Sequence, residues 1–170
     1  MKKIILIIIF ILNFNYSNAE DKIAYININY ILNNSSAGIS ITEHIQKMKD
    51  NKKNEFLIIE KQLAKKEKEI VSQKNILEKS KFNEEVNKLR EEVKIYNEKK
   101  KAFNEEIKNK KLKYTKIILN ELNSIISNYV EKNSISLVFP KKNIIIAKKN
   151  LDITDQIIVL LNKKLTKINF

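Results

Sequence analysis

Three pairs of adjacent glutamates are the side chains best suited to acid–base chemistry in this sequence. The pairs are Glu84 with Glu85, Glu91 with Glu92, and Glu105 with Glu106. Two carboxyl groups beside a reacting bond can act as general acid and general base. Each pair, however, lies between regularly spaced apolar residues, with lysines such as Lys88 three or four positions away. This spacing is typical of ion pairs on the exposed face of a helix, so we interpret the glutamates as surface residues.

The sequence gives little support for any other kind of catalytic site or for a metal site. The only histidine is His44, which has no implied carboxylate partner, and we predict that it lies on a solvated helix face rather than acting as a base or ligand. The chain has no phosphate-binding glycine loop and no nucleophile elbow. It also has no cysteine, which excludes disulfides and thiolate zinc sites. We therefore expect a protein that is not an enzyme and that needs no cofactor.

Two lysine clusters are the remaining candidates for a binding site. The five residues place charge on and beside an apolar seam, and they are Lys99, Lys100, Lys101, Lys110 and Lys111. Such lysines can be tolerated by extending their ammonium groups to water, or they can hold an anionic partner. The formal net charge is +13, about +11 without the first 19 residues, and it favours anionic partners. Part of this lysine excess can also reflect a genome rich in A and T.

A long pair of helices must position these lysines. Over residues 45–77, and again over residues 82–117, apolar residues recur every three or four positions, which is the period of a coiled-coil seam. The seam loses phase at residues 78–81, where we expect the chain to reverse. Residues 41–132 are therefore predicted to form an antiparallel helical hairpin. A single continuous rod is the alternative, because the expected turn contains neither glycine nor proline.

The flanking segments predict a small sheet. Residues 22–29 have the composition of a strand, and a short helical turn is expected to end at Gly38, the only glycine. Residues 135–139 alternate in polarity, and a turn leads to a second apolar run at residues 143–147, which predicts a β-hairpin. Residues 152–155 offer capping oxygens for a short amphipathic helix that closes the chain.

The expected fold class is α+β, with one body built from both ends of the chain. Residues 20–40 form its first part, residues 133–170 its second, and the hairpin is inserted between them. A sheet of about three short strands in about 60 residues rarely holds itself together and leaves pairing edges exposed. We therefore expect an obligate homo-oligomer in which several copies share a β-core.

The N-terminus predicts export. Lys2 and Lys3 precede an apolar stretch over residues 4–12, and a small-residue site ends at Ala19. This arrangement is typical of a secretory signal peptide over residues 1–19. An uncleaved anchor is the alternative, although the apolar stretch is short for a membrane span.

Both ends of the chain resemble the Skp/OmpH family of periplasmic chaperones. The resemblance is carried by KIAYININYILNNSSAG at residues 22–38 and by SISLVFPKKNIIIAKKNLDITDQIIVLLN at residues 134–162, with LDITD at residues 151–155 as the most specific element. It implies a homotrimer with a shared β-barrel body and three helical-hairpin tentacles that enclose a cavity for the bound protein. It also implies an ATP-independent holdase that keeps unfolded outer-membrane proteins, its clients, from aggregating in the periplasm before membrane insertion.

The resemblance transfers residue by residue only to the body. The positions that it assigns to the shared oligomer core are Ile23, Tyr25, Ile28, Leu137, Phe139, Ile144 and Ile146. The hairpin does not align by motif, so client contacts of the five lysines follow from charge alone, and contact with anionic lipid or lipopolysaccharide stays open. The rival functions are a basic coiled-coil spacer or adaptor of the cell envelope and a nucleic-acid-binding coiled coil. We expect no nucleic acid, because export removes the chain from it and no aromatic residues interleave with the lysine clusters.

Overall fold

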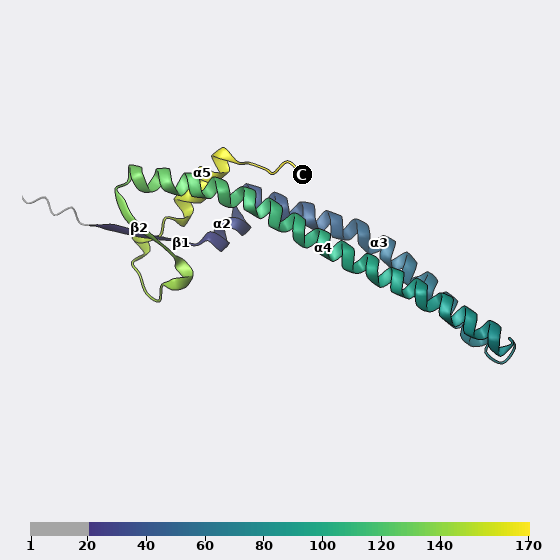
Figure 1. The fold of residues 1–170 in the computed structure, drawn as a ribbon. Coiled ribbons are helices and arrows are strands. Elements are labelled where there is room, and N and C mark those ends of the chain that lie inside the picture. The colour runs from purple at the N-terminus through teal and green to yellow at the C-terminus, as the bar shows by residue number, and fades with distance from the viewer. Residues whose placement is uncertain (1–20) are drawn as a thin grey trace, which may run out of the picture.

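A computed structural model describes residues 21–170 (Figure 1). The predicted signal peptide lies outside the described residues. The elements, in chain order, are β1 (Lys22–Ile26), α2 (Ile28–Asn34), α3 (Ser36–Ser72), α4 (Lys79–Lys132), β2 (Ile135–Pro140), the 3₁₀ turns η1 (Lys141–Asn143) and η2 (Lys149–Leu151), and α5 (Thr154–Lys164).

Helices α3 and α4 form the predicted antiparallel hairpin, which projects from one side of the body as a long arm (Figure 1). At about 1.5 Å per residue, the 37 residues of α3 span about 55 Å and the 54 residues of α4 about 80 Å. Because α4 is longer, its last turns continue past the start of α3 and pack against α5. The α+β class and the helical hairpin are therefore confirmed, and the single rod is excluded.

The reversal lies a few residues earlier than predicted. The connection covers residues 73–78, and α4 already begins at Lys79. Gln73 N–H donates to the carbonyls of Glu69 and Ile70, and Leu77 N–H donates to Gln73 O at 3.0 Å. These bonds continue and tighten the last helical turn, which is how the chain turns without glycine or proline.

Gly38 does not end a helix, and that part of the prediction is wrong. It lies in the first turn of α3, where its amide donates to Ser35 Oγ at 3.2 Å. A Cβ atom at this position would lie 1.9 Å from the carbonyl oxygen of Leu32 in α2. Glycine is therefore required because the α2 backbone passes too close for any side chain.

The sheet differs from the predicted β-hairpin. Strand β2 exists as expected, but it pairs with β1 in a parallel register that places Ile23 opposite Leu137 and Tyr25 opposite Phe139. Residues 143–147 are not a strand, because η1 turns the chain away after Pro140. Ile145 and Ile146 consequently find no strand to bond to in a single chain, and they are 98% and 90% exposed.

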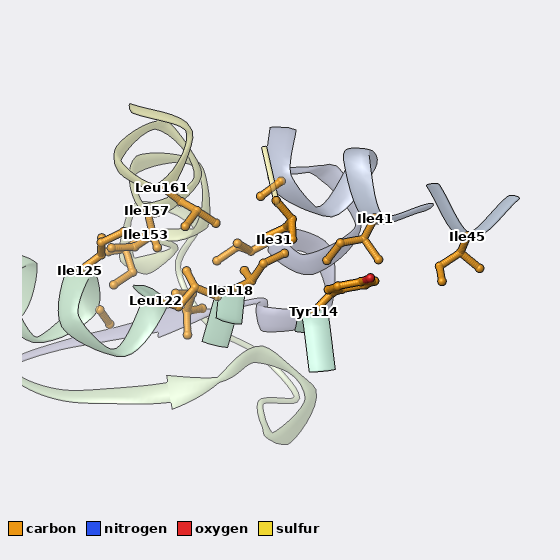
Figure 2. Packing of buried hydrophobic residues seen from close by; sticks show 14 of the residues in the cluster. Ile31, Ile41, Ile45, Tyr114, Ile118, Leu122, Ile125, Ile153, Ile157 and Leu161 are labelled. Atoms are coloured by element: carbon orange, nitrogen blue, oxygen red, sulfur yellow. The ribbon is translucent and has the colours of Figure 1, made fainter. Parts of the chain in front are cut away.

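The core lies between the sheet, the end of α4 and the small helices (Figure 2). Its largest fully buried apolar side chains come from α2, α4 and α5, and they are Ile31, Ile118, Leu122, Ile157 and Leu161. One face of the sheet joins this core through Ala24 and Ile26. The other face carries Ile23, Leu137 and Phe139, which are 44%, 53% and 41% exposed. Tyr25 belongs to the same face but is buried, with the Lys141 ammonium 5.6 Å from the centre of its ring. A single chain thus covers this second face only in part.

The Asp152 carboxylate accepts hydrogen bonds just before α5, although the N-cap residue of this helix is Ile153, whose side chain makes no capping bond. Asp152 Oδ1 accepts a hydrogen bond from Thr154 N–H at 3.0 Å, and Asp152 Oδ2 accepts one from the Lys141 ammonium at 3.0 Å. Thr154 Oγ1 in turn accepts from Asn27 N–H at 2.9 Å. This network joins the start of α5 to the end of β1. Burial alone would raise the pKa of Asp152, but the hydrogen bonds from Thr154 and Lys141 outweigh it and hold the pKa below its ordinary value of 3.8.

Replacement of this carboxylate should destabilise the body in a pH-dependent way. A lowered folded-state pKa stabilises the fold above the unfolded-state pKa, and the contribution is lost as the pH falls through the folded-state pKa. Asp152→Asn should therefore lower the free energy of unfolding by about 1–2 kcal/mol at pH 7, with a smaller difference from wild type at pH 3 and below. Urea denaturation at a fixed protein concentration measures this. Asp50→Asn is the control, because Asp50 bonds only the neighbouring Gln46 on exposed α3. An equal loss at both pH values would contradict the assignment.

The tail that follows α5 returns to the root of the arm. The Phe170 ring stacks on His44 with centroids 3.8 Å apart and planes 4° apart, and it meets Tyr114 edge-on at 5.1 Å. Ile168 is buried in the core, and its N–H donates to Ser40 Oγ at 3.4 Å. The prediction of a solvated His44 is therefore wrong, since the imidazole is half-buried in an aromatic cluster.

Candidate functional site on the helical arm

Aromatic side chains hold the middle of the arm together. Phe56 of α3 meets Tyr96 and Phe103 of α4 edge-to-face, with centroids 5.8 Å and 5.9 Å apart. Tyr96 is buried, and the two phenylalanines are half-buried. These residues lie on the predicted seam, so its aromatic positions belong to the packed interface between the two helices.

Polar contacts between the helices fix their register at the same level. The Tyr96 hydroxyl donates to Glu60, and the Lys100 ammonium lies 3.4 Å from Glu60 Oε1 and 5.3 Å from the centre of the Tyr96 ring. The hydrogen bond from Tyr96 lowers the pKa of Glu60, and Lys100 lowers it further. One such surface pair contributes little to stability. Both contacts join Glu60 of α3 to residues one helical turn apart on α4, and together they favour this alignment of the two helices.

The five predicted contact lysines do not line one common groove. Lys100 bonds to Glu60, and Lys110 pairs with Glu106 of its own helix at 3.4 Å. Lys101 and Lys111 are exposed on α4. Lys99 borders a groove that Lys100 does not line, because adjacent residues on a helix point about 100° apart.

The groove beside Lys99, hereafter the mid-arm groove, has a volume of about 600 Å³. Its apolar lining is Ile59, Leu63, Ile95 and Tyr96, and its polar lining is Gln62, Lys65, Lys66, Glu69, Glu92 and Lys99. Across one end, Lys66 and Glu92 form an ion pair at 2.6 Å. Lys66 stands at a seam position, where an apolar residue would pack between the helices. The apolar side chains beside this ion pair are therefore only partly covered. The period over residues 45–77 places Leu63 in the seam, so the sequence did not predict the groove. The only sequence signal for it is Lys66, a lysine at a seam position.

The body presents a second exposed surface, hereafter the outer sheet face, made of Ile23, Leu137 and Phe139. With Ile146, these are four of the seven positions that the family resemblance assigns to the oligomer core, and all four are exposed in a single chain. Tyr25 is buried, with the Lys141 ammonium 5.6 Å from its ring centre.

The two remaining positions are Ile28 and Ile144. Ile28 begins α2 instead of extending the strand and packs on the chain's own core, and Ile144 is half-buried beyond η1. The strand assignment is therefore wrong for both of these residues, and also for Ile146, which lies between η1 and η2.

Comparison with known proteins gives the family. The model of the family described as outer membrane protein (OmpH-like) matches residues 22–161. The chain belongs to the OmpH-like family. This match covers the arm, both strands and most of α5, so the whole architecture is that of the family.

A solved OmpH-like structure has the same fold. It comes from Caulobacter crescentus, is described as an outer membrane chaperone, and superposes with a TM-score of 0.77 at 15% sequence identity. The superposition covers 89% of this chain and 90% of that one. No curated protein matches the chain.

Two further kinds of site concern residues 21–170 of the OmpH-like chain, a metal site and a membrane span. In that part of the chain, no three His, Cys, Asp or Glu side chains gather to form a metal site. No helix there is both long and apolar enough to cross a bilayer.

Proposed function

We propose that this chain is an ATP-independent periplasmic holdase that binds unfolded outer-membrane proteins and prevents their aggregation before membrane insertion. The observation that carries the proposal is the arm itself. It is a stiff two-helix projection on an OmpH-like body, and its surface mixes lysines with exposed apolar side chains such as Ile58, Ile95 and Leu112. The description of the Caulobacter crescentus protein as an outer membrane chaperone supports the same function.

Charge supplies the attraction. We count a net charge of +7 over residues 41–132. Outer-membrane strands alternate apolar and polar residues, and many of these proteins are acidic. A basic arm attracts acidic chains over about a Debye length, roughly 8 Å at physiological salt. Weak apolar contacts then hold the client without a single dominant anchor, which keeps it mobile and releasable.

Assembly of several chains would create a cavity between their arms. The outer sheet face is apolar on a two-stranded sheet, and a sheet of this size is marginal alone. We propose that identical copies join through this face and residues 144–147, and that the assembly is the homotrimer expected for the family. Three arms around one shared β-core would enclose space for a client. Export by the N-terminal signal peptide, with cleavage after Ala19, would place this assembly in the periplasm.

Aggregation of an unfolded porin tests the proposal. Diluting the porin from urea into buffer should give strong light scattering, and equimolar assembled protein should suppress most of it without ATP. Raising the salt from about 0.05 M to 0.5 M should weaken capture by about tenfold. Undiminished aggregation would overturn the holdase and leave a spacer or adaptor. Capture that does not depend on salt would remove the electrostatic step alone.

A further inference from the structure

We infer that the mid-arm groove is a defined contact site for an extended client segment in which apolar and acidic or polar side chains alternate. The inference rests on the proposed holdase function and adds to it a specific subsite. Two other grooves between the helices of the arm gather three and two apolar side chains, whereas this groove gathers four from both helices into one concave surface.

The dimensions of the groove suit a short extended segment. Its α3 wall runs from Ile59 to Glu69, which is about 15 Å at 1.5 Å per residue. An extended chain rises about 3.3 Å per residue, so the wall accommodates four to five residues. Ile59 and Leu63 lie one helical turn apart, about 6 Å along the axis. This spacing is close to the repeat of about 6.6 Å between alternate side chains of a strand.

The floor of the groove is preformed. Tyr96 is buried, and its hydroxyl bonds to Glu60 on the opposite helix, which fixes the ring in place. Ile59 and Leu63 are half-buried, and Ile95 is 44% exposed at the edge. A client segment would therefore cover apolar surface that is already ordered, and ordering the site would cost little.

The charges of the groove favour a carboxylate on the occupant. Lys66 pairs with Glu92 at 2.6 Å, and Lys65 pairs with Glu69 at 3.8 Å. Among the ion pairs formed within residues 21–170, none involves Lys99. Its ammonium stays available at the edge of the apolar floor. Lys99 would thus select acidic residues next to apolar ones, a role that its neighbours Lys100 and Lys101 do not share.

Two matched pairs of variants test the site by the affinity of the assembled protein for an unfolded porin. Ile95→Ser should weaken binding about fivefold, because it removes apolar surface from the floor. Leu119→Ser is its control, with 41% exposure on the same helix, and should change binding less than twofold. Lys99→Gln should weaken binding about threefold at low salt, whereas Lys101→Gln, which loses the same charge, should have a smaller effect. Equal effects within both pairs would overturn the subsite.

A labelling experiment identifies the occupant directly. The chain has no cysteine, so Ile95→Cys and Leu119→Cys each carry one polarity-sensitive dye. Adding unfolded porin should shift the emission at position 95 more than at position 119. A shift at position 95 that appears without client as the protein concentration rises would assign the groove to a second copy and overturn the inference. If the wild-type protein does not suppress porin aggregation, the holdase proposal itself is wrong. If the wild-type protein suppresses aggregation but the matched variants do not differ, only the groove proposal is wrong.

Discussion

Leu137→Glu should convert the assembled protein into folded monomers. Leu137 is 53% exposed on the outer sheet face and lies opposite Ile23, so a carboxylate there leaves the single-chain core intact. In an assembly that joins through this face, the charge would be buried without a partner at a cost of several kcal/mol. We expect the dissociation constant to rise at least 100-fold, as measured by sedimentation velocity at micromolar concentration. Circular dichroism should show unchanged helix content.

Val159→Glu is the matched control for that experiment. Val159 is 52% exposed, almost the same as Leu137, but it lies on α5. The control variant should stay assembled. If it dissociates while Leu137→Glu does not, the interface involves α5 and not the sheet. A wild-type chain that sediments as a folded monomer would contradict the shared β-core altogether.

Gly38→Ala should severely destabilise the body, although an alanine in a helix usually stabilises it by up to 1 kcal/mol. The new Cβ would lie 1.9 Å from Leu32 O and 2.8 Å from Leu32 C. Both are backbone atoms, so relief requires α2 and α3 to separate. Such overpacking costs about 3 kcal/mol, and it should lower the melting temperature by roughly 10 °C or more. Thermal unfolding followed at 222 nm measures this.

A neighbouring position controls for effects on the first turn of α3. Ile39 is 45% exposed, and Ile39→Ala should change the free energy of unfolding by less than about 1 kcal/mol. Comparable losses in both variants would mean that the α2–α3 contact is adjustable. In that case Gly38 would not be required by sterics.

The sequence predicts the arm well because its pattern is local. A 3.5-residue period over residues 45–77 and 82–117 depends only on which side chains face the partner helix, and Tyr96, Ile107 and Tyr114 are indeed buried. The reversal is displaced by a few residues because the last turn of α3 tightens without a glycine or proline to mark it.

The errors concern contacts between distant parts of the chain. Alternation at residues 135–139 identifies a strand but not its partner, and proximity suggested residues 143–147 where the structure has β1. The cluster of His44 with Phe170 joins positions that no local pattern connects. Gly38 was interpreted as a helix stop, but glycine is required there because the backbone of α2 passes close by. That contact leaves no local pattern in the sequence.

The candidate site was predicted in composition but not in shape. The charge pattern identified Lys99 together with four other lysines. Only the packed structure shows that Lys99 borders the mid-arm groove, whereas Lys100 bonds to Glu60. The residues of α3 that line this groove could not be chosen from sequence, because their exposure depends on how α3 aligns with α4.

The parallel pairing of β1 with β2 has a consequence for the order of folding. The two strands are more than a hundred residues apart in the chain, so the sheet cannot close until nearly the whole polypeptide is available. Closing a loop of that length as a flexible coil is slow and entropically unfavourable. Each helix of the arm is held by local hydrogen bonds, and pairing of α3 with α4 outward from the turn at residues 73–78 would bring β1 and β2 together. The same helices that we propose to hold other proteins would then act first as the scaffold on which their own body is completed.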